Sequence, residues 1–302
     1  MNDILILDGG MSRELVRLGA QLRQPEWSAL ALIDTPDIVR DVHREFMEAG
    51  ADVVTTNSYA LVPFHIGETR FRTEGEALIA LSGRLAREAA DAFTARKVRV
   101  AGSLPPIFGS YEPQLFEPAK VQDYLCVLVA GLSPYVDVWL GETLSLIAEG
   151  EAVRLAVART GKPLWISFTL TDAPAETTVG LPRLRSGETV EQAATWAVSA
   201  GLQGLLFNCS RPEVMADAVR VAANIFGEHK AQIAIGVYAN AFEPLQEEGA
   251  ANEALHATRE DLTGDVYCDF AASWVEAGAS LIGGCCGVGT AHIHRLANRL
   301  RY

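Results

Sequence analysis

The sequence lacks several features that are typical of membrane, secreted or nucleic-acid-binding proteins. The 302-residue sequence contains no run of about 18 apolar residues, so no segment is expected to span a bilayer. The N-terminus lacks a basic region and Asp8 interrupts its apolar stretch, which argues against a secretory signal peptide. Positive charge is scarce, because 25 Lys and Arg face 38 Asp and Glu and give a formal net charge of -13. Such a surface repels polyanions, so we expect no nucleic acid or anionic membrane as a partner.

Cysteine and several catalytic motifs are also scarce or absent. Five cysteines in 302 residues are too few for a disulfide framework, which favours a reducing, cytoplasmic location. The sequence has no P-loop, no Ser-His-Asp pattern and no G-x-G-x-x-G after its first apolar run. No low-complexity linker divides the chain, so we expect one domain over residues 1–302.

What the sequence does contain is a repeating pattern of strands and helices. The apolar runs are nearly continuous rather than alternating, as in parallel strands covered on both faces. Helical patterns separate them: at 35–50, Thr35 can cap the helix, Pro36 suits its first turn and Gly50 can end it, and a similar stripe covers 265–278. Eight such units predict an α/β fold, a (β/α)8 TIM barrel in a single domain, with an open doubly wound sheet as the alternative. The apolar runs lie at 4–7, 52–56, 98–102, 136–141, 163–169, 204–208, 232–238 and 279–283.

Polar side chains gather where these predicted strands end. In a barrel, the carboxyl ends of all strands face one side, and active sites form there from the following loops. The loop-like segments 103–118, 170–187 and 239–264 all follow predicted strands and would cover this face. The polar residues at the strand ends are Asp8, Thr56, Asn57, Ser103, Glu142, Asp172, Asn208, Cys209, Tyr238, Asn240, Cys285 and Cys286.

The strongest local signal is the GGCCG segment at 283–287, directly after the last predicted strand. Cys209 ends the sixth strand, and alternate strands of a barrel send side chains into the same layer. Sulfur atoms of Cys209, Cys285 and Cys286 could therefore converge on one Zn²⁺ and leave its fourth position open, as catalytic zinc requires. Three buried free cysteines, or a vicinal disulfide, are the alternatives. Cys126 and Cys268 lie inside predicted amphipathic helices and are expected to serve packing.

Glu142 and Asp8 are the two carboxylates expected at the barrel mouth. They could act as a general acid–base pair, bind an ammonium group or, for Glu142, be structural. His292 and His294 are two residues apart in a predicted terminal helix, so they face different directions and are read as surface or cap residues.

The combined motifs resemble those of the homocysteine S-methyltransferase family, a group of zinc-dependent barrels. The NCS and GGCCG pair resembles the metal signature of that family, which implies zinc on Cys209, Cys285 and Cys286 and gives these cysteines and Glu142 the catalytic roles. The resemblance further implies that Glu142 holds the ammonium group of homocysteine. It also places Asp8, the backbone of Gly9 and Gly10, Asn57 and Asn208 around this substrate. The likeness covers nearly the whole chain, in LDGGMSREL at 7–15, TTNSY at 55–59, GET at 141–143, WISFTL at 165–170, RSGET at 185–189, NCSRPEVM at 208–215 and GGCCGVGTAHI at 283–293.

The resemblance implies a methyl transfer from a sulfonium donor, S-methylmethionine or S-adenosylmethionine, to homocysteine, a step of methionine biosynthesis. The chain departs from the family at GSLPPIFGSYEPQLF (102–116), at YANAFEP (238–244) and after the paired cysteines, so the thiol acceptor is better supported than the donor. Tyr111, Phe108 and Phe116 could offer aromatic faces to a cationic donor, or could only pack. Open alternatives are a betaine-like donor, another thiol or a selenol as acceptor, a metal-independent lyase or hydrolase using Glu142 and Asp8, and a non-catalytic zinc- or thiol-binding protein. Small-molecule substrates and a monomer or small homo-oligomer are expected.

Overall fold

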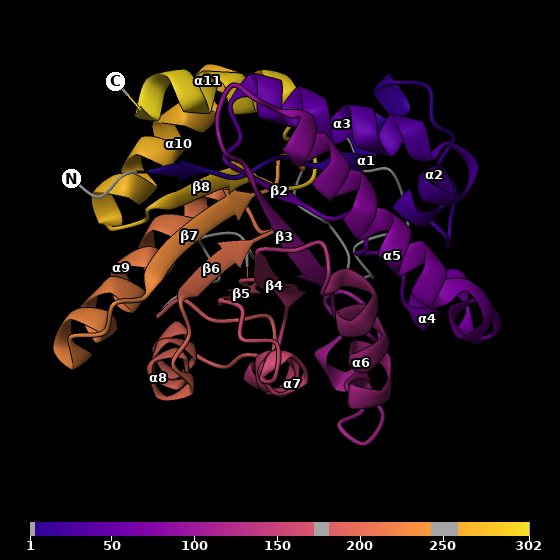
Figure 1. Cartoon of the computed structure of the whole chain (residues 1–302). Coiled ribbons are helices and arrows are strands. Elements are labelled where there is room, and N and C mark those ends of the chain that lie inside the picture. The colour runs from indigo at the N-terminus through magenta and orange to yellow at the C-terminus, as the bar shows by residue number, and fades with distance from the viewer. Residues whose placement is uncertain (1–3, 172–180, 243–258, 302) are drawn as a thin grey trace.

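The computed structural model in Figure 1 shows a ring of parallel strands surrounded by helices. It describes residues 4–171, 181–242 and 259–301. All eight predicted apolar runs are confirmed as strands, in the order β1-β8-β7-β6-β5-β4-β3-β2. Their bounds are β1 (Leu5–Ile6), β2 (Val53–Thr55), β3 (Arg99–Leu104), β4 (Val138–Leu144), β5 (Leu164–Phe168), β6 (Gly204–Asn208), β7 (Ala234–Ala239) and β8 (Leu281–Gly284).

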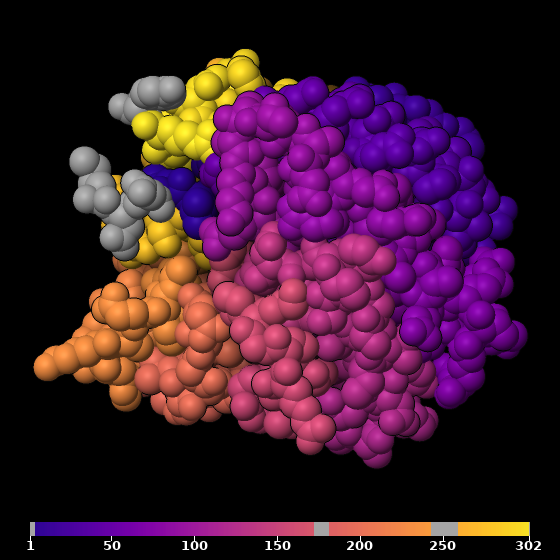
Figure 2. Space-filling view, viewed as in Figure 1, coloured from indigo at the N-terminus to yellow at the C-terminus, as the bar shows by residue number. Residues whose placement is uncertain are grey.

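Residues next to β1 and β2 close the ring between these two strands. Leu7 forms a parallel bridge with Val53. The amide of Asp8 donates to the Val53 carbonyl at 3.0 Å, and the amide of Asp52 donates to the Ile6 carbonyl at 2.7 Å. In Figures 1 and 2 the first helices, in indigo, and the last, in yellow, accordingly lie on the same side of the molecule. The predicted (β/α)8 barrel is therefore confirmed, and the open doubly wound sheet is wrong.

The helices cover the outside of the ring and largely follow the sequence signals. The predicted helix at 35–50 is α3, which ends where Gly50 takes φ 119°. Thr35 does precede α3, but its side chain makes no capping bond and instead donates to the Ala31 carbonyl at 3.2 Å. The helices are α1 (Met11–Arg17), α2 (Ser28–Asp34), α3 (Pro36–Ala49), α4 (Pro63–Ile66), α5 (Glu68–Ala92), α6 (Val121–Leu132), α7 (Ile147–Val157), α8 (Val190–Ala200), α9 (Pro212–His229), α10 (Gly264–Ala277) and α11 (Thr290–Leu300), with a 3₁₀ turn, η1 (Pro113–Leu115).

The apolar core has two layers, as the double burial of the strands requires. A larger layer lies between the strands and the helices and contains Phe46, Phe168 and Trp274. A smaller layer fills the inside of the ring and contains Leu7, Val53, Ala101, Val138, Leu140, Trp165, Leu206, Tyr238 and Leu281. Because the inside of the ring is packed, the barrel is a solid platform for residues at the strand ends and not a pore.

Two smaller expectations have different outcomes. Cys268 is buried on α10 as expected for packing, whereas Cys126 is exposed on α6, so the packing role assigned to it is wrong. The loops after β3, β5 and β7 do leave the same end of the barrel, although residues 172–180 and 243–258, including Asp172, lie outside the described residues. Among the described helices, none combines the length and the apolar composition needed to cross a membrane.

Candidate active site

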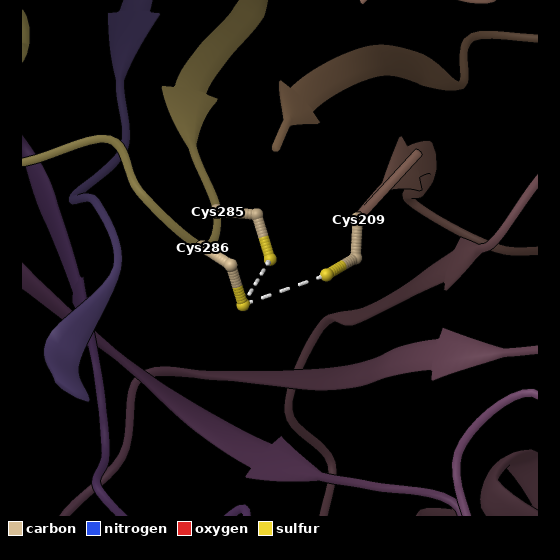
Figure 3. A group of neighbouring side chains, drawn as sticks. All are labelled: Cys209, Cys285 and Cys286. Atoms are coloured by element: carbon tan, nitrogen blue, oxygen red, sulfur yellow. Dashed lines mark hydrogen bonds between the residues drawn. The ribbon is translucent and has the colours of Figure 1, made fainter. Parts of the chain in front are cut away.

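The carboxyl ends of the strands bring three cysteines together. Cys209 directly follows β6, and Cys285 and Cys286 directly follow β8 (Figure 3). The Sγ atom of Cys286 lies 3.7 Å from that of Cys209 and 4.0 Å from that of Cys285, and all three sulfur atoms lie within 4.8 Å of one another. None of them forms a disulfide, so a vicinal bond between Cys285 and Cys286 is absent from this structure.

This sulfur cluster has the dimensions of a zinc site. Around tetrahedral Zn²⁺ with bonds of about 2.3 Å, ligand sulfurs lie about 3.8 Å apart. The measured separations of 3.7 and 4.0 Å match that spacing. Thiolates are soft ligands suited to zinc, and three of them leave one tetrahedral position for a substrate. The donor set therefore fits a catalytic zinc ion.

The backbone around the cluster is held in uncommon conformations. Cys209 has φ 49°, a left-handed conformation that a non-glycine residue rarely adopts. Its carbonyl oxygen accepts a hydrogen bond from the Tyr111 hydroxyl at 2.9 Å, and its amide donates to the Tyr238 carbonyl at 3.2 Å. After Cys286, Gly287 supplies the turn with φ 81°, a conformation that favours glycine. These features direct the sulfur atoms toward one point.

The three thiols share their charge unequally. Hydrogen bonds from Cys285 and Cys286 hold the pKa of Cys209 well below its usual value. The same bonds to Cys209 raise the pKa of Cys285 and of Cys286. The cluster therefore already favours one thiolate before any positive ion neutralises it, which suits it to bind a dication.

Asn208 contacts this cluster through its side-chain amide. The side chain is fully buried, and its Oδ1 accepts from the Thr143 amide at 3.0 Å and from the Ser167 hydroxyl at 2.7 Å. Its Nδ2 donates to the Thr143 hydroxyl at 2.9 Å and lies 3.9 Å from the Cys285 sulfur. With the amide fixed on both sides, one N–H points at the Cys285 sulfur, an arrangement typical of the partners of metal ligands.

Glu142 points to the centre of the ring because β4 is irregular there. The pairing of β4 with β5 shifts register between Gly141 and Leu144, and Thr143 has φ 61°. Such bulges turn a side chain away from its regular direction and occur next to active sites. The Glu142 carboxylate accepts hydrogen bonds from the Ser103 hydroxyl and, at 3.4 Å, from the Tyr238 hydroxyl. Burial raises the pKa of Glu142 to about 7.

Asp8 supplies a second buried carboxylate. Its Oδ2 accepts from the Thr55 amide at 2.7 Å and its Oδ1 from the Thr55 hydroxyl at 3.1 Å. Burial raises the pKa of Asp8 to about 7, and the negative charge of Glu142 adds to this rise. Two buried carboxyl groups that each resist ionisation form a site where a cation would be bound favourably.

The other residues predicted for the substrate lie close by but are partly engaged within the fold. The Gly10 amide donates to the Val288 carbonyl at 2.8 Å, and a Cβ at Gly10 would lie 2.6 Å from the Cys285 carbonyl oxygen. A Cβ at Gly9 would lie 2.3 Å from the Val288 carbonyl oxygen. Both glycines therefore allow the first loop to pack on the cysteine loop. Asn57, which is buried, donates from Nδ2 to the Ser28 carbonyl at 3.2 Å.

The aromatic residues of the loop after β3 divide into two groups. Phe108 packs edge-to-face on Tyr124, and Phe116 lines a small apolar cavity, so these two serve packing. Tyr111 does face a cation, but that cation is the Arg185 guanidinium, whose Cζ lies 4.0 Å from the ring centroid. Sequence reasoning missed Arg185, Thr143 and Ser167 as site residues, although they lie in the RSGET, GET and WISFTL segments.

Comparisons with known proteins agree with this geometry. A sequence-family profile described as homocysteine S-methyltransferase matches residues 5–300. The homocysteine S-methyltransferase of Escherichia coli K12 is 30% identical over 98% of this chain and 95% of its own length. Homocysteine S-methyltransferase 1 of Arabidopsis thaliana is 29% identical over 98% of this chain and 93% of its own length. The crystal structure of the metallated homocysteine methyltransferase MmuM from Escherichia coli superposes with a TM-score of 0.78, at 28% identity, and covers 99% of this chain and 96% of that one.

Proposed function

The chain belongs to the homocysteine S-methyltransferase family, and from this premise we propose that it is zinc-dependent and takes its methyl group from a sulfonium donor. The donor is S-methylmethionine or S-adenosylmethionine, the acceptor is the thiol of homocysteine, and the product is methionine. The observation that carries the proposal is the three-sulfur cluster beside a buried carboxylate pair. One part of this site suits a metal-bound thiol, and the other suits the ammonium group of an amino acid.

Cys209, Cys285 and Cys286 would hold the zinc ion. A free alkyl thiol has a pKa of about 8.5, so little of it is ionised at neutral pH. Bound zinc would supply the missing ionisation, because a thiol that coordinates it loses its proton. The spacing of the sulfur atoms and the metallated form of the Escherichia coli relative both support this assignment. Asn208 would act by keeping the Cys285 sulfur oriented.

Glu142 and Asp8 would bind the ammonium group of homocysteine. An ammonium ion between them favours their ionised forms, and this attraction fixes the amino-acid end of the substrate at the barrel centre. Gly9 and Gly10 would line the same end, while Asn57 would hold the adjoining α2 segment through Ser28. Binding at two ends leaves the thiol little freedom, so its sulfur can be held in line with the methyl carbon.

The transfer itself needs little acid–base chemistry from the protein. The acceptor sulfur forms a bond to the methyl carbon while the bond from that carbon to the sulfonium sulfur breaks. The electron pair of the broken bond stays on the departing sulfur, which becomes a neutral thioether. The thiol proton is released to solvent when homocysteine binds as a thiolate. No leaving group requires protonation, which agrees with a site built from thiols and carboxylates.

The test is turnover of zinc-loaded protein with homocysteine and a panel of methyl donors. We expect stoichiometric zinc after metal-replete purification and methionine formation with a sulfonium donor. Turnover with betaine alone, or with selenohomocysteine and not homocysteine, would replace the donor or the acceptor proposed. Full activity without metal would favour carboxylate chemistry by Glu142 and Asp8, and zinc binding without any turnover would indicate a non-catalytic protein.

A further inference from the structure

Tyr111 joins the loop after β3 to the backbone of Cys209, one of the three proposed zinc ligands. The tyrosine hydroxyl donates to the Cys209 carbonyl oxygen at 2.9 Å. No other group among the residues that the structure describes donates a hydrogen bond to this carbonyl. Because Cys209 is buried, loss of the bond would leave a backbone acceptor with little access to water, which is unfavourable. The conformation at Cys209 therefore depends on this hydroxyl.

The backbone on either side of Cys209 is tied to β7 and to the residue that follows it. The Cys209 amide donates to the Tyr238 carbonyl at 3.2 Å, and the Ser210 carbonyl accepts from the Asn240 amide at 3.1 Å. Between these two bonds Cys209 takes φ 49°, a conformation that persists in a non-glycine residue only where the surroundings hold it. Tyr111 supplies a contact at the peptide group between Cys209 and Ser210, where neither of the other bonds acts.

Tyr111 is itself held in place by its own loop and by a neighbouring one. Its backbone takes φ 66° soon after Gly109 at φ 131°, so the chain turns sharply at this point. The buried Ser110 hydroxyl forms a hydrogen bond with the Tyr59 hydroxyl, which ties the turn to the segment after β2. The Arg185 guanidinium covers the Tyr111 ring, with its Cζ 4.0 Å from the ring centroid. The hydroxyl is therefore presented to Cys209 from a fixed position.

We propose that Tyr111 is a positioning residue for the zinc site, because its hydroxyl holds Cys209 in the left-handed conformation that directs the Cys209 sulfur toward Cys285 and Cys286. Figure 3 shows the three side chains pointing toward one another from two separate segments. The inference rests on the proposed function, since it takes these sulfur atoms to be zinc ligands. It assigns to the loop after β3 a role in the metal site that no motif of the sequence had indicated.

Cys209 is the ligand whose placement matters most for the affinity of the cluster. Cys285 and Cys286 are adjacent in the chain, whereas Cys209 lies 77 residues before Cys286 and reaches it only through the fold. If Cys209 relaxed to an ordinary backbone conformation, its Cβ would turn and its Sγ would leave the position 3.7 Å from the Cys286 Sγ. Zinc binding would then have to restore the left-handed conformation, and the affinity would fall by the fraction of protein that has relaxed.

The test is Tyr111→Phe in the full chain, which removes the hydroxyl and keeps the ring beside Arg185. Zinc affinity in a chelator competition should fall by roughly 10- to 100-fold, the range for loss of a group that orients a metal ligand. Co²⁺ bound in place of zinc gives a second measurement, because its visible d–d bands depend on the geometry of the ligands. These bands should differ from those of wild type, since one of the three ligands has moved.

Tyr124→Phe is the matched control, because the Tyr124 hydroxyl on α6 donates to the Glu68 carboxylate at 3.1 Å and takes no part in the cluster. It should keep the zinc affinity and the Co²⁺ spectrum of wild type. In the metal-free proteins, the free energy of unfolding should fall no further in Tyr111→Phe than in Tyr124→Phe.

Wild-type zinc affinity or an unchanged Co²⁺ spectrum in Tyr111→Phe would overturn the inference. An equal loss of affinity in Tyr124→Phe would do the same, as would a larger loss of metal-free stability in Tyr111→Phe, because the hydroxyl would then support the fold as a whole. Wild type that binds zinc but makes no methionine would refute the proposed function and leave the inference intact. Wild type that binds neither zinc nor Co²⁺ would refute both.

Discussion

Replacing Glu142 by Gln tests the ammonium site with the least change of shape. The glutamine amide can still accept a hydrogen bond from the Ser103 or the Tyr238 hydroxyl, so the side chain has partners in its present position. What the substitution removes is the negative charge at the centre of the ring. The hydrogen bonds between Asp8 and Thr55 do not involve Glu142, so the substitution should leave the second carboxylate in place.

The size of the effect follows from the burial of this carboxylate. A hydrogen bond between two charged groups in a partly dehydrated site contributes about 1.5–3 kcal/mol, or roughly 10- to 150-fold in binding. Glu142 is one of two carboxylates there, so we expect the KM for homocysteine to rise by roughly 10- to 100-fold in Glu142→Gln. The zinc content and the KM for the donor should be close to wild type, because Glu142 is not a member of the sulfur cluster.

The assay is steady-state kinetics with homocysteine varied at saturating donor, repeated with 4-mercaptobutanoate, which is homocysteine without its amino group. Wild type should prefer homocysteine strongly, and Glu142→Gln should lose most of that preference by losing affinity for homocysteine alone. An equal loss with both thiols would mean that Glu142 does not bind the ammonium group. Unchanged kinetics with both would refute the charge argument altogether.

The same carboxylate predicts a pH dependence. Burial raises the pKa of Glu142 to about 7, so below that pH the free enzyme holds a neutral carboxylic acid at this position. A neutral group attracts ammonium weakly, and kcat/KM for homocysteine should fall as the pH drops through about 7. Asp8 titrates in the same range, so Glu142→Gln should retain a fall of about half the slope. A profile identical in wild type and variant would contradict the assignment.

Three further changes test other parts of the structure. Cys286→Ser should lose both zinc, measured by mass spectrometry, and activity, because a hydroxyl is a poor zinc ligand; retained activity would contradict the role of the cluster. Asn208→Ala should weaken zinc binding by roughly 10- to 100-fold in a chelator competition, and wild-type affinity would show that its contact with Cys285 is incidental. Burial raises the pKa of Glu149 from 4.5 to about 7, so its stability contribution is greatest at low pH and falls as pH rises through that window. The free energy of unfolding of Glu149→Gln, relative to that of wild type, should therefore rise by about 3 kcal/mol between about pH 4 and pH 8. Denaturant unfolding measures it, and a difference that stays constant over this range would refute the reasoning.

The strands and the sulfur cluster could be predicted because their signals are local. An apolar run of five residues between turn residues defines a buried strand without reference to its neighbours. Once eight such runs alternate with helices, barrel closure fixes which ends share a face, so Cys209 and the pair at 285–286 must come near one another. The distances then depend only on residues directly after β6 and β8.

The rest of the site depends on contacts that no local pattern contains. Thr143 takes a left-handed conformation and meets Asn208, which lies 65 residues later. Arg185 stacks on Tyr111, which lies in another loop, so the sequence around either residue does not predict the contact. Thr35 shows the same limit at small scale, because its position at the start of α3 was correct but its hydroxyl binds the preceding helix instead.

The burial of the two carboxylates favours a cationic ligand beside them. Asp8 and Glu142 each have a pKa raised to about 7 mainly by burial, so near neutral pH their ionised forms weaken the fold. A bound ammonium group offsets that cost, since it stabilises the charges that burial disfavours. Under the proposed function, homocysteine carries this ammonium group, and its thiol would reach the sulfur cluster. Under the proposed function, the pair would thus discriminate homocysteine from thiols without an amino group through the same electrostatics that raise the two pKa values.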